Sequence, residues 1–318
     1  MKDKPILWVF LAFTLGFALP VCSCVGTGAL TMGALSQLGQ QPLPRTVGTG
    51  DAVAVIRLDG TITAASQEYL PTAVITPDRV RSLLDQAAAN PAVKAVVVRV
   101  NSPGGSVVAS DEIYQAFLAY DKPIIISMGD TAASGGFYIS CGGDYVIAHP
   151  DTLTGSIGVI SQFFNVQDLL DKVGVDAVVI TTGPFKDIGT PYREMTEEEK
   201  ELWREILDQI YEDFVAVVAE ARDLPAEQVR EVADGSIYTG QQAYDLGLVD
   251  AVGTRQAAID KAAELGDIEG EPRIIELRAQ PSFLEMVYGF QARSFMPTLE
   301  EVIGWAGTPS LQYHVPTQ

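Results

Sequence analysis

The chain has 318 residues, of which 47% are hydrophobic and 8% aromatic, so it can form one large or two modest domains with a proper core. Its 41 acidic against 21 basic residues give a formal charge of −20, which argues against a nucleic-acid-binding protein, since such a protein needs a basic face for phosphates. Three cysteines cannot supply a disulfide framework, so stability must come from the core. We expect no nucleic-acid partner.

The chain opens with an apolar segment that predicts a membrane anchor. Residues 5–44 contain no charged side chain, and residues 6–25 are long enough to cross a ~30 Å hydrocarbon core as one helix. Two lysines before this segment favour a cytoplasmic N-terminus. We therefore expect residues 1–38 to be a single-pass anchor in the cell membrane, with the rest of the chain on the extracytoplasmic side. A cleaved signal sequence, or a lipid on Cys24, is the alternative.

Strands and helices alternate in the body of the chain, which we expect to span residues 51–269 after a Pro/Gly linker at 39–50. Apolar runs typical of buried strands lie at 53–58, 93–100, 124–128 and 145–148. Helical patterns lie at 77–89, 110–120, 134–141 and 197–222, the last with a capping box of Thr196 and Glu199. This order predicts an α/β fold with right-handed crossovers. Another strand is expected at 273–277, within a C-terminal extension, 270–318, whose role stays open.

Two small-residue turns follow buried strands, at the carboxyl edge of the sheet where sites form in parallel sheets. Gly104 and Gly105 in the first turn could leave amides free for an oxyanion hole, but an ordinary β–α turn explains two glycines more simply. Ser134 lies in the second turn, 129–137, at an expected helix N-terminus. That position suits a nucleophile, but taken alone it is better explained as a plain N-cap.

A nucleophilic serine needs a general base, and the sequence offers few. Nothing near His149 or His314 recommends either of them for a Ser-His-Asp triad. A lysine can serve if burial lowers its pKa from ~10.4 to ~7–8. Lys186 is the candidate because it follows Gly-Pro-Phe and an apolar residue lies close behind it. Asp187 beside it could equally mark a surface turn, and the spacing alone favours a solvent-exposed lysine.

Several independent motifs occur in an order that closely resembles the signal peptide peptidase A (SppA) family, serine protease family S49, in its short single-domain form. The resemblance runs from about residue 53 to 265 and also suits an N-terminal anchor. The motifs are Arg99-Val-Asn-Ser-Pro-Gly-Gly105, Ala132-Ala-Ser-Gly-Gly136, Thr154-Gly-Ser-Ile-Gly-Val159, Phe185-Lys-Asp-Ile-Gly189, Arg193-Glu-Met-Thr196, Gly235-Ser-Ile-Tyr-Thr-Gly240 and Ala243-Tyr-Asp-Leu-Gly-Leu-Val-Asp250.

The resemblance implies a ClpP/crotonase-like fold of repeated β-β-α units and a Ser-Lys dyad, with Ser134 as nucleophile and Lys186 as general base. It implies that Ser156 positions the lysine, and that the amides of Gly105 or Gly104 and of Gly135 form the oxyanion hole. The expected substrates are cleaved signal peptides and other hydrophobic peptides in the membrane. A homo-oligomer, an octamer by resemblance, is expected, and neither a metal nor another cofactor is required.

Three other functions compete with this reading. The first is a protease of the same fold that cleaves a specific membrane protein. The second is a crotonase-type acyl-CoA hydratase or isomerase, which would have no reason to carry an anchor. The third is a membrane scaffold without catalytic activity, against which the intact set of Ser134, Ser156 and Lys186 argues.

Overall fold

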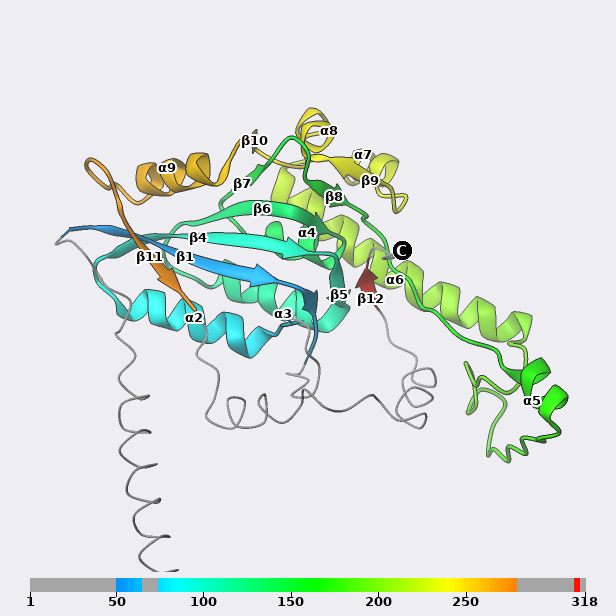
Figure 1. The fold of residues 1–318 in the computed structure, drawn as a ribbon. Coiled ribbons are helices and arrows are strands. Elements are labelled where there is room, and N and C mark those ends of the chain that lie inside the picture. The colour runs from blue at the N-terminus through cyan, green and yellow to red at the C-terminus, as the bar shows by residue number, and fades with distance from the viewer. Residues whose placement is uncertain (1–49, 65–73, 279–311, 315–318) are drawn as a thin grey trace, which may run out of the picture. The chain divides into compact units, whose positions relative to one another are not determined.

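The described part of the chain is built around a mostly parallel β-sheet (Figure 1). A computed structural model describes residues 50–64 and 74–278, and the backbone of 312–314. The predicted anchor, nearly all of the linker and most of the C-terminal extension lie outside these residues. Within them, no helix has the length and apolar character needed to cross a membrane.

The main sheet has the strand order β10-β7-β6-β4-β1-β11, and β8 and β9 continue it beside the end of β6. All neighbours along that order are parallel, as is the β6–β8 pair, whereas β8 and β9 are antiparallel. The strands are β1 (Ala52–Asp59), β4 (Val93–Ser102), β6 (Ile124–Ala133), β7 (Tyr145–Ala148), β8 (Leu153–Gly155), β9 (Ile237–Thr239), β10 (Ala251–Val252) and β11 (Arg273–Leu277). Because β11 pairs with β1, the sheet continues past residue 269.

Short strands at the carboxyl ends of β1 and β4 form a second, smaller sheet. Its order is β12-β5-β2-β3, with β12 antiparallel to β5 and the other pairs parallel. These strands are β2 (Thr61–Ile62), β3 (Val74–Ile75), β5 (Gly104–Ser106) and β12 (Gln312–His314). A long strand, a short strand and a helix therefore follow one another in chain order, which is the β-β-α repeat that the resemblance implies.

Helices cover both faces of the main sheet (Figure 1). Alternate residues of β1 and β4 point to opposite faces, so Ala54 and Val96 pack in the core under α2 and α3, while Val53 and Val97 pack against α9. The helices are α2 (Pro77–Ala89), α3 (Val107–Leu118), α4 (Gly135–Ser140), α5 (Gln167–Val173), α6 (Glu197–Arg222), α7 (Ala226–Val232), α8 (Gly240–Asp245) and α9 (Arg255–Leu265).

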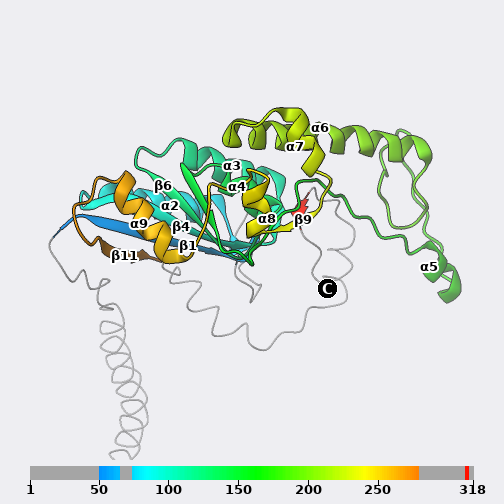
Figure 2. The same cartoon turned by 90° about the horizontal axis from the view of Figure 1, so that it is seen from above.

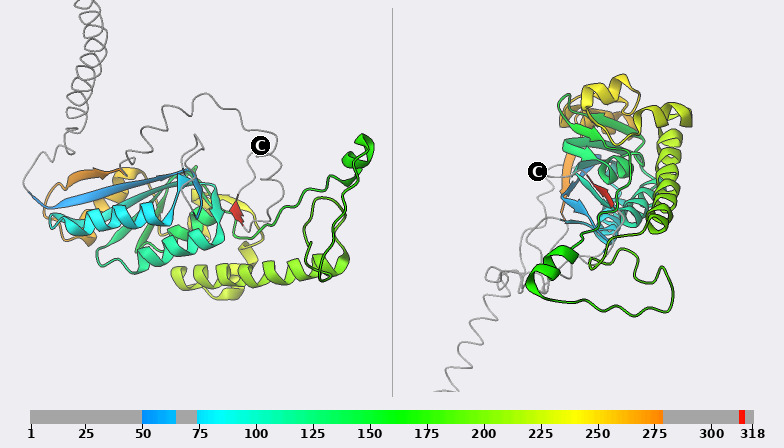
Figure 3. Two further views of the ribbon diagram at one scale, coloured as in Figure 1. Left: turned by 90° about the horizontal axis from the view of Figure 1, so that it is seen from below. Right: turned by 90° about the vertical axis from the view of Figure 1, so that its right-hand side faces the viewer.

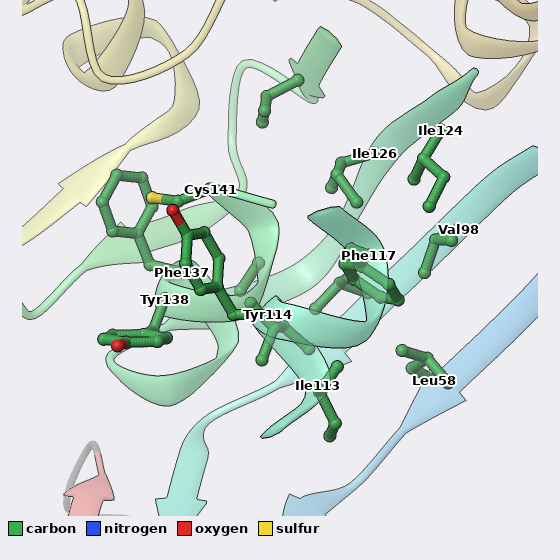
Figure 4. Close-up of a cluster of buried hydrophobic side chains, with 14 of the residues drawn as sticks. Leu58, Val98, Ile113, Tyr114, Phe117, Ile124, Ile126, Phe137, Tyr138 and Cys141 are labelled. Carbon is green, nitrogen blue, oxygen red and sulfur yellow. The ribbon is translucent and has the colours of Figure 1, made fainter. Parts of the chain in front are cut away.

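An aromatic cluster joins α3, α4 and the C-terminal half of α6 in the larger core. Figure 4 shows two of its members, Tyr114 and Tyr138. The ring of Tyr138 in α4 lies 5.5 Å from that of Tyr114 in α3 and 5.0 Å from that of Phe214 in α6, both in edge-on contact. At the end of α6, Arg222 forms an ion pair with Asp250, whose carboxylate also accepts the amide of Val146. The C-terminal half of α6 is therefore fixed to the body of the fold.

The residue ranges predicted for α2, β7, α6 and β11 agree with the structure, and both halves of the Thr196–Glu199 capping box are present. The prediction that a turn begins at Gly129 is wrong, because β6 continues to Ala133. Residues Thr131–Ala133 pair with β8, and the Thr131 amide donates to Asn101 Oδ1 at 3.2 Å. This long-range pairing outweighs the low strand propensity of Gly129-Asp130.

Residues 160–195, which we call the arm, leave the body of the fold between β8 and α6. Figures 1 and 3 show that the N-terminal half of α6 extends away from the sheet and that α5, within the arm, lies beyond this end of α6. Figure 2 shows the same arrangement from above. The arm exposes large apolar side chains, including Val178 and Ile180, which are 84% and 91% exposed. Surface of this kind is typical of an interface.

Candidate active site

Ser134 occupies a sharp turn between β6 and α4. Its φ of 54° and ψ of −119° are rare for a residue with a side chain, and such strain persists only where surrounding contacts impose it. Here the Ser134 amide donates to Gly155 O at 2.8 Å, and its carbonyl accepts the Tyr138 amide at 2.8 Å. The nucleophilic serine of α/β-hydrolases also lies on a strained strand-to-helix turn.

The Ser134 hydroxyl is unpartnered in the described chain. The residue is 1% exposed, and its Oγ lacks a hydrogen-bond partner among the described residues. The side chain does not cap α4, so the N-cap explanation of this serine fails. A buried hydroxyl without a partner costs free energy, and such groups are typical of sites completed by something else.

Three glycines surround this turn at very close range. A Cβ placed on Gly135 would lie 3.2 Å from both the Cα of Gly104 and the amide nitrogen of Gly105, and 2.7 Å from Ser110 Oγ. Gly104 and Gly105 have φ values of 106° and 155°, which side chains rarely adopt. The glycines predicted for the oxyanion hole are thus brought together beside Ser134, with the amides of two different chain segments close to each other.

Ser156 lies next to Ser134 because β8 runs parallel to β6. Ala133 is paired with Gly155, so the two serines are the first residues beyond the last pair of the two strands. Ser156 also has a positive φ, of 50°, and its amide donates to Ser236 O at 2.7 Å. Its residue exposure is 8%, so it forms part of the same buried edge.

Lys186 is not part of this cluster. It belongs to the arm, in a turn where its amide donates to Gly183 O at 3.2 Å, and it is exposed. The described chain provides no hydrogen bond or ion pair for its ammonium group. The structure therefore brings Ser134, Ser156 and the three glycines together, and leaves the predicted base on a segment that projects away from them.

His149, whose side chain is described, does not take the place of Lys186. His149 lies on the surface, where its Nδ1 accepts the amide of Asp151 at 3.2 Å. The described residues also contain no group of three His, Cys, Asp or Glu side chains arranged to hold a metal. Cys141 is buried, and burial raises the pKa of its thiol to about 12, so it is not a reactive nucleophile.

Two features of the site were missed by the sequence analysis. Strand β12 pairs with β5 so that Tyr313 and His314 lie opposite Gly105 and Gly104. Arg193 binds the carboxylates of both Asp187 and Glu199. The pairing of β12 with β5 joins segments some 200 residues apart, which the periodicity of a sequence cannot reveal. The charge cluster could have been found, because the spacing of Asp187, Arg193 and Glu199 after Lys186 indicates it.

Comparison with known proteins agrees with these observations. The sequence matches the profile of peptidase family S49 over residues 116–269 and the Clp protease profile over residues 75–154. A candidate protease of Synechocystis sp. is 45% identical over 185 residues, which cover 58% of this chain and 66% of that protein. Protease 4 of Salmonella typhi is 37% identical over 258 residues, 80% of this chain and 41% of the relative.

A candidate signal peptide peptidase SppA of Enterococcus faecium is 43% identical over 172 residues, 53% of this chain and 50% of that protein. The matched part of the chain thus spans between 41% and 66% of the length of these three relatives. The Clp protease match and the β-β-α repeats confirm the predicted ClpP-like α/β fold. From the family profile and the relatives together, the chain belongs to peptidase family S49.

Proposed function

We propose that the protein is a membrane-bound serine endopeptidase that hydrolyses hydrophobic peptides, such as signal peptides left in the membrane after cleavage. The observation that carries this proposal is the strained Ser134 turn beside Gly104, Gly105 and Gly135. The apolar residues 6–25 would hold the enzyme where such peptides lie. The relative named as an SppA supports the choice of substrate class.

In the proposed mechanism, the neutral amine of Lys186 takes the proton of the Ser134 hydroxyl as Oγ forms a bond to the scissile carbonyl carbon. The amides of Gly105 or Gly104 and of Gly135 stabilise the negative charge that develops on the carbonyl oxygen. The C–N bond then breaks, and Lys186 returns the proton to the leaving amine. Water, activated by the same lysine, hydrolyses the acyl-enzyme. Ser156 would hold the lysine amine, a role supported by its position at the end of the strand adjacent to β6.

The base would be supplied by a neighbouring copy of the chain. Two observations support this part of the proposal. The Ser134 Oγ lacks a hydrogen-bond partner among the described residues, and Lys186 is exposed on the arm, which projects away from Ser134. The apolar side chains of the arm would be buried against the neighbour, which also gives the assembly its driving force. Repeating one such head-to-tail contact around an axis closes a ring, and the family resemblance suggests an octamer.

Substrate would bind as an extended strand along the outer edge of β5. Support comes from β12, which already pairs antiparallel with this edge opposite Gly104 and Gly105. Adding a strand to a sheet edge is a common mode of peptide recognition, because the main chain provides the hydrogen bonds. A peptide in the position of β12 would run past the proposed oxyanion hole.

Removing β12 should therefore improve substrate binding. We expect a variant that ends at residue 311 to have a KM about 10-fold lower for a hydrophobic fluorogenic peptide, with kcat nearly unchanged, because a tethered competitor has been removed. A variant that ends at His314 retains β12 and serves as the control. Equal KM values for the two variants would show that β12 does not occupy the substrate edge.

The proposed activity is tested by hydrolysis of the same peptide between about pH 6 and 10. Wild type should be active, with a rate that rises with pH as the base loses its proton. Both Ser134→Ala and Lys186→Ala should reduce kcat to background, and His149→Ala should not. Activity that survives Lys186→Ala would refute the dyad, and a folded, assembled wild type without activity would favour the scaffold function.

A further inference from the structure

The turn that carries Lys186 is held by a cluster of three charged side chains, Asp187, Arg193 and Glu199. Arg193 donates to Asp187 at 3.0 and 2.9 Å, and to Glu199 at 2.8 and 2.5 Å. Its remaining donor reaches the carbonyl of Glu194 at 3.0 Å. The five N–H groups of a guanidinium are thus all used, in the planar two-carboxylate geometry that lysine cannot reproduce.

Glu199 connects this cluster to the body of the fold. It lies in the first turn of α6 with its side chain 2% exposed, and it accepts the amide of Thr196 at 2.8 Å. A carboxylate is favourable there because of the free amides and the helix dipole. The other end of α6 is fixed by Phe214 in the core and by the Arg222–Asp250 ion pair. The position of the cluster is therefore set by the core through α6.

Asp187 connects the cluster to the base. It follows Lys186 directly, and its carbonyl accepts the amide of Thr190 at 3.0 Å, which closes the turn. The turn is also held by packing, since a Cβ on Gly189 would lie 2.6 Å from the ring of Phe163, and that ring lies 5.1 Å from Trp203 of α6. Its backbone is thus fixed on both sides of Lys186, while the lysine side chain is left exposed.

The geometry points to Asp187, Arg193 and Glu199 as positioning residues that aim Lys186 at the Ser134 of a neighbouring copy and neutralise the carboxylate beside it. This inference rests on the proposed function of Lys186 as the base. Without Arg193, the charge of Asp187 would be uncompensated next to the lysine and would favour its protonated, inactive form. The cluster would then serve both the orientation and the proton affinity of the base.

The cluster itself stays charged where the enzyme would be assayed. The hydrogen bonds from Arg193 hold the pKa values of Asp187 and Glu199 below their usual range, and those two carboxylates raise the pKa of Arg193. A lowered carboxylate pKa adds stability that is lost only as the pH falls through that lowered value. Any midpoint in the pH–rate profile above pH 6 would therefore report the base and not the cluster.

The test is the pH–rate profile of the assembled enzyme with a hydrophobic fluorogenic peptide. Asp187→Asn leaves the Arg193–Glu199 pair in place and should move the midpoint down, whereas Arg193→Gln frees the Asp187 charge and should move it up, each by about one pH unit. Both should lower kcat at the plateau about 10- to 100-fold, because a misplaced base reacts slowly. In the double variant the upward shift should disappear, while kcat stays low.

Arg204→Gln is the matched control, since it breaks an exposed ion pair with Glu201, 2.9 Å long, on the same helix. It should change neither midpoint nor plateau. Lys186→Ala, assayed in parallel, separates the two proposals: if it retains activity, the dyad itself is refuted. If it is inactive while Asp187→Asn and Arg193→Gln both behave like Arg204→Gln, the dyad stands and the positioning role is overturned. Should Arg193→Gln fail to assemble, the shift and plateau of Asp187→Asn decide the question alone.

Discussion

Ser134→Ala and Lys186→Ala proteins, each inactive alone, should regain peptidase activity when they are mixed and allowed to assemble. The first variant retains the base and the second retains the nucleophile, so an arm from one can complete the site of the other. With random mixing of equal amounts, about one quarter of the sites receive both groups across a head-to-tail contact. Hydrolysis of the fluorogenic peptide should rise from background to about one quarter of the wild-type rate.

A matched control uses the Ser134→Ala/Lys186→Ala double variant in place of Lys186→Ala, and this mixture should remain inactive. Two different affinity tags would establish that mixed assemblies form. No recovery in mixtures whose chains co-purify would mean that Ser134 and Lys186 of the same chain work together. In that case the arm would have to fold back onto its own body, and the exposed position of Lys186 would not be the catalytic one.

Gly135→Ala is expected to reduce kcat about 100- to 1000-fold, the effect of losing an oxyanion-hole donor. The new methyl group would lie 3.2 Å from the Cα of Gly104 and from the amide nitrogen of Gly105, so the two halves of the proposed hole must separate by a few tenths of an ångström. Ser110 Oγ, at 2.7 Å, is itself held by a hydrogen bond to Ser106 O. A small displacement here changes the distance to the oxyanion directly.

The stability of the fold should decrease much less than kcat, because alanine is a better helix former than glycine at the start of α4. Circular dichroism and the unfolding midpoint would check this. Arg204→Gln, which breaks only an exposed ion pair with Glu201 on α6, is the control. A Gly135→Ala enzyme with wild-type kcat would mean that these amides do not bind the oxyanion.

Much of the fold could be predicted because its elements are locally determined. The apolar run at 93–100 indicated a strand buried on both faces, and Val96 and Val97 do pack on opposite sides. The capping box at Thr196 fixed the start of α6. The extension of β6 through Gly129-Asp130 could not be predicted, since it depends on pairing with β8, some 20 residues further along the chain.

The candidate site also has a part that could be predicted from the sequence and a part that could not. Ser134, Ser156 and the glycines follow the ends of parallel strands, and the topology of a parallel sheet brings such strand ends to one edge. The position of Lys186 depends instead on the arm, whose apolar surface has no partner within the described chain. No local pattern in the sequence specifies where such a segment lies, because its final contacts would be made with another molecule.

Helix α6 extends for 26 residues, about 39 Å at ~1.5 Å per residue, with one end fixed in the core and the other near the arm. Under the proposed mechanism, the nucleophile Ser134 and the base Lys186 would lie toward opposite ends of this helix, so one copy alone could not bring them together. A newly made copy would then be harmless to the proteins around it. Proteolytic power would grow more steeply than the number of copies, so the cell could set it simply through how much of this chain it makes.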